Sequence, residues 1–160
     1  MNWEALGASG ELVGVLLVIV SVIYLAQQVR QNTTTSRSEV MGTISIEMAK
    51  QYEAWGSDQR SSELFHKIVY EDYRRADFSD TDMTSMSFLV ISRVYLYEAA
   101  YRSYREGILT ESEFLPMMAS KMWNMPFLID SWPIYVMEFS PDFVAYMEET
   151  FETLAKARSE

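Results

Sequence analysis

The stretch RVYLYEAAYRSYREG, which begins at Arg93, places basic, acidic and phenolic side chains at helical spacing. Tyr97 and Tyr101 fall on one side of a helix, and Glu98 borders that side. Arg93 precedes Glu98 by five residues, and Arg102 follows it by four. A carboxylate acceptor, a guanidinium partner for anions and tyrosine rings are typical of a small-ligand pocket. The pocket candidates are therefore Arg93, Tyr97, Glu98, Tyr101 and Arg102, in a ligand sensor or an enzyme.

A purely structural interpretation of the same helix is simpler, and we favour it. Glu98 and Arg102 then form an ordinary pair one turn apart, which contributes about 0.2–0.5 kcal/mol. Tyrosine hydroxyls that become buried still need hydrogen-bond partners. This interpretation therefore also predicts a polar network around Glu98.

Glu63 and His66 have the Glu-x-x-His spacing that places two metal ligands on one face of a helix. A di-iron bundle needs a second such pair, and the chain has one histidine and no cysteine. The sequence also lacks a glycine-rich phosphate loop and a nucleophile elbow. We therefore predict no metal ligand, no cofactor and no catalytic residue.

The element that comes first in the chain is an apolar run, GVLLVIVSVIYLAQQV, which begins at Gly14. No residue between Glu11 and Arg30 is charged, and this length of helix covers roughly 27 Å of a hydrocarbon core of about 30 Å. A cleaved signal peptide is disfavoured because no basic residue precedes the run, and the bulky Tyr24 occupies the site that cleavage requires to be small. We predict one transmembrane helix; the alternative is a soluble helical protein whose first helix is buried.

Flanking residues predict how this helix lies in the membrane. Trp3 and Tyr24 are placed as aromatic anchors at the two interfaces, and Arg30 marks the basic end. Because positive charge favours the cytoplasm, we expect the N-terminus outside. The predicted domains are a membrane anchor at 1–32, in contact with lipid, and a cytoplasmic all-α domain at 33–160.

Small residues on the anchor helix predict packing against another helix. They are Gly7, Gly10, Gly14 and Ser21, and small residues let two helix backbones approach closely. Glu11 is costly near the membrane unless a partner supplies a hydrogen-bond donor. The partner is expected to be another copy or a different membrane protein. The plainer interpretation is that glycine is simply frequent in spans.

Caps and apolar spacing predict an all-α bundle after the anchor. The expected helices cover about 38–55, 59–75, 79–105, a segment from 110 and a segment from 140. Two arrangements are open for the first of these. It is either a separate helix or a continuation of the span as one stalk, since no Pro or Gly interrupts residues 33–35. Prolines between 125 and 141 predict short helical pieces there. The Met- and Trp-rich segment 117–132 is expected to be core instead of a partner surface.

Two motifs resemble those of a family of small bacterial single-pass membrane proteins. The first is ExxGxxGExxG from Glu4, followed after the apolar run by YLAxQxRQNT from Tyr24. The second is looser, an Arg/aromatic/Glu helix that ends in Gly107 and, later, FSPDF from Phe139. The resemblance implies a bacterial inner-membrane protein, and it brings no catalytic residue because the family has no assigned activity.

These observations predict a membrane-anchored interaction or accessory module that is oligomeric or part of a larger inner-membrane complex. The net charge of −10 disfavours nucleic acid as a partner. The alternative functions are a small-ligand sensor or an enzyme that uses the helix around Glu98.

Overall fold

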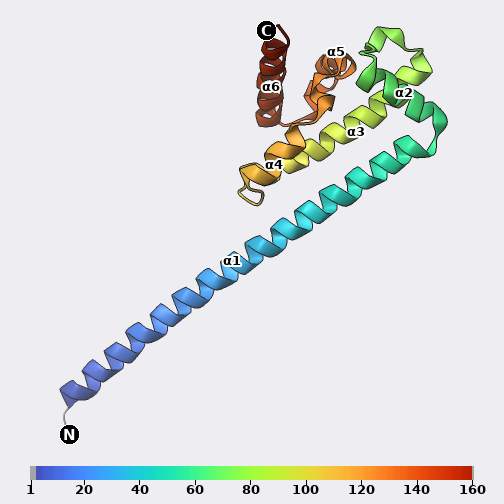
Figure 1. Cartoon of the computed structure of the whole chain (residues 1–160). Helices are drawn as coiled ribbons and strands as arrows, with labels where there is room; N and C mark the ends of the chain where they lie inside the picture. Colours follow the sequence, from blue (N-terminus) through green and yellow to red (C-terminus); the bar gives the residue numbers. More distant parts are fainter. Residues whose placement is uncertain (1–2, 160) are drawn as a thin grey trace. The chain divides into compact units, whose positions relative to one another are not determined.

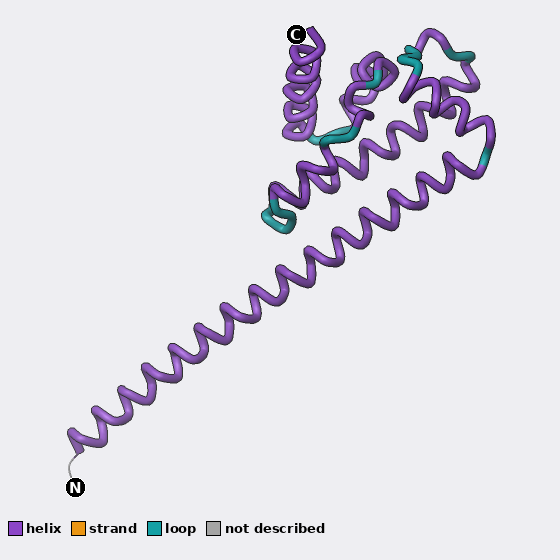
Figure 2. The backbone as a smooth tube through the Cα atoms, in the orientation of Figure 1, coloured by secondary structure: helices purple, strands orange, loops and turns teal. Residues whose placement is uncertain are grey.

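The computed structural model describes the backbone of residues 3–159 and the side chains of residues 14–157. Over this range the chain is helical, without strands, as the all-α prediction required (Figures 1 and 2). The α-helices are α1 (Trp3–Ser57), α2 (Gln59–Tyr70), α3 (Asp80–Arg105), α4 (Glu111–Met118), α5 (Pro126–Tyr135) and α6 (Pro141–Ser159). Short 3₁₀ helices lie at Arg75–Asp77, Lys121–Asn124 and Val136–Glu138.

The chain divides into two compact units, Met1–Glu39 and Val40–Glu160. The division lies within α1, several residues after the expected boundary at 32/33. Of the two arrangements left open at residues 33–35, the structure has the continuous one, since α1 is one helix. Thr33 and Thr34 fit inside it because their hydroxyls donate to the carbonyls of Val29 and Arg30, each at 3.0 Å.

The unit Val40–Glu160 is organised around α3, which contacts α2, α4, α5 and α6. In Figure 1 α3 crosses this unit, with α2 near one end and α4 near the other. Its core is strongly aromatic, and the expectation that Trp123 and Trp132 belong to it is confirmed. The largest fully buried side chains include Trp123, Arg93, Phe114, Phe127, Phe143, Met86 and Met147.

Most helices begin and end at the capping residues that the sequence predicts. Ser79 accepts from the Asp82 N–H at 3.3 Å, and the Thr110 N–H donates to Glu113 at 2.8 Å. Gly107 has φ +73°, the left-handed conformation that ends α3. Prolines break the following segment into short pieces, as expected.

The predicted end of the second helix at Arg75 is wrong. α2 stops at Tyr70, and Asp72 adopts φ 53°, which a continuing right-handed helix does not allow. The Glu71 and Tyr73 N–H groups both donate to the carbonyl of Lys67. Asp tolerates the left-handed region better than most residues, so a local turn replaces the last helical turns.

Two glycine substitutions separate backbone strain from helix propensity. Gly107→Ala should lower the free energy of unfolding by about 1–2 kcal/mol because of its positive φ. Gly42→Ala, in helical backbone, should raise it by about 0.5–1 kcal/mol. An added Cβ meets nothing within 4 Å at either position, so steric clash does not complicate the comparison. Urea unfolding of the detergent-solubilised chain, followed by tryptophan fluorescence, gives both values; equal effects would contradict the argument.

Candidate functional site

Arg93 is a buried cation without an ionic partner among the described residues. Its side chain is 2% exposed, and its Nε and Nη2 atoms have no hydrogen-bond partner. The guanidinium carbon lies 4.6 Å from the ring centroid of Tyr52 and 4.9 Å from that of Trp55. Cation–π attraction therefore stabilises the charge, while the N–H donors of Nε and Nη2 remain unsatisfied.

The end of α1 and the start of α2 bring these rings against α3. Gln51 Nε2 donates to Ser92 Oγ at 3.3 Å, which joins α1 to α3 beside Arg93. Asp58 caps α2 by accepting from the Ser61 N–H at 2.7 Å. The tight connection lets Trp55 stack on Phe65 of α2, with ring centroids 4.3 Å apart.

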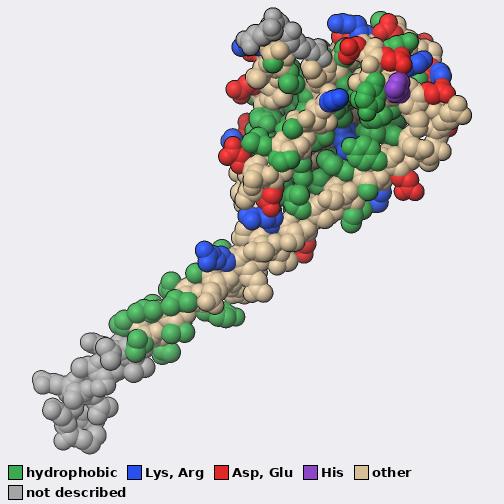
Figure 3. Space-filling view, viewed as in Figure 1, with side chains coloured by type: hydrophobic (Ala, Val, Ile, Leu, Met, Phe, Trp, Pro, Cys, Tyr) green, Lys and Arg blue, Asp and Glu red, His purple; other side chains and the backbone are tan. Residues whose placement is uncertain are grey.

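A cavity of about 200 Å³ lies beside Arg93. Its lining consists of Tyr52, Trp55, Phe65, Val69, Tyr70, Arg93, Tyr97, Ser120, Lys121 and Met122. These lining residues include two bases and no carboxylate. Figure 3 shows basic atoms recessed among hydrophobic side chains on the visible face of this unit.

Tyr97 forms part of the cavity wall as a neutral phenol. Its ring packs on Trp123 with centroids 4.4 Å apart, and its side chain is 4% exposed. Burial raises the pKa of Tyr97, although its contacts with Ser120 and Arg93 oppose that shift. The hydroxyl therefore stays protonated at neutral pH, so it cannot serve as a counter-ion for Arg93.

Two residues of the lining, Tyr52 and Tyr70, are 60% and 65% exposed. A second hollow of about 320 Å³ shares these two tyrosines, with Trp55 and Phe65, and reaches His66. His66 Nε2 lies 3.5 Å from Glu71 Oε1. Among the residues that the structure describes, no three His, Asp or Glu side chains are placed to hold a metal ion.

Glu98 does not join Arg93 in this cavity. It is 7% exposed, and its Oε1 accepts from the Ser140 N–H at 2.8 Å, at the start of α6. Arg102 Nη2 lies 3.7 Å from the same oxygen, but the Arg102 side chain is 65% exposed. Glu98 therefore anchors the start of α6, and Arg102 is a surface residue.

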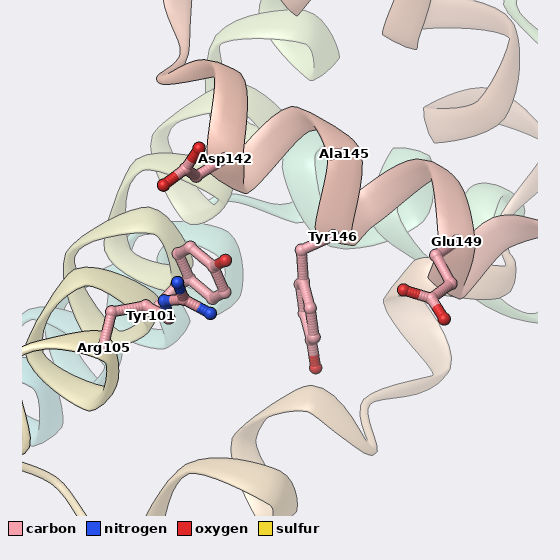
Figure 4. Close-up of a pocket in the computed structure, with 6 residues that line it drawn as sticks. All are labelled: Tyr101, Arg105, Asp142, Ala145, Tyr146 and Glu149. Atoms are coloured by element: carbon pink, nitrogen blue, oxygen red, sulfur yellow. The ribbon is translucent and has the colours of Figure 1, made fainter.

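Tyr101 lines a different, shallow cleft of about 320 Å³ between α3 and α6. Figure 4 shows Tyr101 and Arg105 projecting from α3, opposite Asp142, Tyr146 and Glu149 of α6. The rings of Tyr101 and Tyr146 lie 4.9 Å apart. Burial raises the pKa of Tyr146, so its phenol is neutral as well. The five pocket candidates thus separate. Arg93 and Tyr97 line the cavity, Glu98 anchors α6, Tyr101 lines this cleft, and Arg102 lies on the surface.

The candidates on the anchor helix are described only in part. Around Gly14 an added Cβ would meet nothing within 4 Å, and Ser21 Oγ donates to the Leu17 carbonyl at 2.8 Å. Tyr24 and Arg30 are exposed. The side chains at Trp3, Gly7, Gly10 and Glu11 lie outside the described residues.

Most of the cavity wall was missing from the sequence-based candidate list. The sequence carries no functional prediction for Tyr52, Trp55, Tyr70 or Lys121. The wall comes from four segments of the chain, so no local spacing brings its residues together. The available signal was Arg93 itself, a charged residue within an otherwise apolar helical face.

No family model, curated protein or solved structure matches the chain. No activity, substrate or partner can therefore be carried over from a relative, and the functional argument depends on the geometry.

The anchoring role of Glu98 predicts unequal effects of two substitutions. Glu98→Ala removes the acceptor of a part-buried N–H and should lower the free energy of unfolding by about 1–3 kcal/mol. Glu98→Gln retains an acceptor oxygen and should lose less. Glu149→Ala, at an exposed position on α6, is the control and should change stability by under about 0.5 kcal/mol. Urea unfolding measures all three; equal losses for Glu98→Ala and Glu149→Ala would contradict this role.

Proposed function

We propose that the chain is a membrane-anchored helical module of the bacterial inner membrane. Its N-terminus lies outside, and the unit from Val40 onwards lies in the cytoplasm. The module works by association, with another copy or with a different membrane protein. The observation that carries the proposal is the exposed apolar surface of α1.

The apolar part of α1 has the length and composition of a membrane span. Among the described residues, α1 from Gly14 onwards is the one helix that is long and apolar enough to cross a bilayer. None of its most apolar 18-residue stretch is buried. Leu17 is 63% exposed and Val29 is 65% exposed. A continuous apolar surface of this kind is an aggregation hazard in water, whereas lipid covers it. This exposure supports a span over the alternative of a buried first helix.

The polar groups of the same stretch are compatible with lipid. A helix satisfies its backbone hydrogen bonds internally, which the hydrocarbon core requires of any spanning segment. The Ser21 hydroxyl also donates within the helix, to the carbonyl of Leu17. Arg30 and Arg37 follow the apolar run, and their positive charge favours the cytoplasmic side.

Association is supported by surfaces of the single chain that no other part of it covers. The space beside Gly14 is empty, and close helix packing uses small residues of this kind. In the other unit Met137 is 91% exposed and Phe88 is 69% exposed. A ligand-sensing role remains a second candidate because of the cavity at Arg93.

Single cysteines test the topology, because the native chain has none and gives no background labelling. In intact cells a membrane-impermeant maleimide should label Asn2→Cys. The same reagent should label Glu152→Cys only after the inner membrane is opened. Labelling of both positions from the same side would overturn the single pass, and a detergent-free soluble chain would overturn the anchor.

Leucine at both Gly10 and Gly14 should reduce association, because bulk at these positions keeps helix backbones apart. The matched control is Val18→Leu, within the same apolar run. Particle size after gentle solubilisation, measured by light scattering, should fall for the double variant and not for the control. Identical particles for the native chain and the double variant would place assembly in the other unit.

A further inference from the structure

We propose that the cavity beside Arg93 binds a small aromatic carboxylate. This inference goes beyond membrane anchoring, and it depends only on residues of the unit Val40–Glu160.

The free donors of Arg93 match a carboxylate in geometry. Nε and Nη2 carry the two parallel N–H bonds along one edge of the guanidinium, and both lack partners. A carboxylate accepts from such an edge through both of its oxygens, in the bidentate arrangement that makes arginine the preferred residue for this anion. A buried cation without a counter-ion is costly, so binding of an anion relieves a penalty that the unliganded protein carries.

Two other side chains of the cavity wall can also interact with an anion. Trp55 Nε1 is a buried donor without a partner. Lys121 adds a second positive charge at the rim, where its Nζ lies 5.9 Å from the ring centroid of Tyr70. The lining residues carry no acidic side chain, although the whole chain has a net charge of −10. The local charge therefore attracts the anion that the rest of the molecule repels.

The remaining walls select a flat, apolar body. Trp55 and Phe65 form a stacked pair, and Tyr52 meets Trp55 edge to face with centroids 5.6 Å apart. The volume of about 200 Å³ is below the range of about 300–1,000 Å³ typical of ligand sites, so the ligand is small. Inorganic phosphate would leave these aromatic walls unused.

A structural role for Arg93 is the competing explanation, and it makes opposite predictions. If the cation–π contacts to Tyr52 and Trp55 are the purpose of Arg93, its loss lowers stability. If the site exists for an anion, an apolar replacement of similar length removes an unpaired charge and leaves stability unchanged or higher.

Titration calorimetry of the full chain in a zwitterionic detergent provides the test. The probes are sodium benzoate and indole-3-acetate, with benzamide as the neutral analogue and inorganic phosphate as the anion without a ring. Saturable binding of at least one carboxylate, with neither benzamide nor phosphate binding, supports the proposal. The absence of saturable heat with both carboxylates up to about 10 mM overturns it. Equal binding of phosphate overturns the aromatic selectivity.

Arg93→Met should weaken carboxylate binding by at least about tenfold. Arg102→Met, on the surface of the same helix, should leave binding within about twofold of native. The melting temperature without ligand should not fall in Arg93→Met; a fall, together with unchanged carboxylate binding, identifies a structural arginine and overturns the proposal.

Lys121→Met at the exposed rim keeps the test valid if Arg93→Met does not fold, and should weaken binding severalfold. Unchanged binding in Lys121→Met overturns the role of the rim charge. None of these results depends on the membrane topology.

Discussion

The unit from Val40 onwards depends on burying one face of α3 even though two of the side chains buried there are charged. Arg93 and Glu98 are both nearly inaccessible to water, and a buried charge is stable only when other groups replace its hydration. The protein treats the two differently. Glu98 receives a backbone N–H from the start of α6, whereas Arg93 receives aromatic faces and has donors left over. Glu98 thus holds α6 against α3, whereas Arg93 keeps unpaired N–H donors to which a ligand can bind.

The backbone of this fold was largely predictable because its signals are local. Ser79 with Asp82, and Thr110 with Glu113, mark helix starts through contacts three residues apart. Gly107 marks an end through its own dihedral preference. The end of α2 was missed because Asp72 allows a left-handed turn without requiring one. Whether Asp72 continues the helix or forms a turn depends on tertiary packing, which a pattern of residue types does not encode.

The candidate site was predicted less well for a related reason. Helical spacing singled out Arg93 and Tyr97, which line one cavity, but it assigned Glu98 and Tyr101 to the same pocket. When several helices pack around one helix, each of its side chains contacts the helix that packs against its own face. Adjacent positions on α3 therefore face different helices, and only the tertiary arrangement shows that Arg93 meets Tyr52 and Trp55.

The hydrogen bond from Ser140 to Glu98 joins residues 42 positions apart in the chain. Starting a helix is the unfavourable step of helix formation, since several residues become ordered before their hydrogen bonds compensate. For α6 an acceptor at this step comes from α3 and not from its own neighbourhood. The formation of α6 is therefore coupled to that of the central helix α3, and the two helices gain order cooperatively. During synthesis this contact can form only after the segment from α3 to Ser140 has left the ribosome, so α6 cannot gain this support while its own residues are still being added.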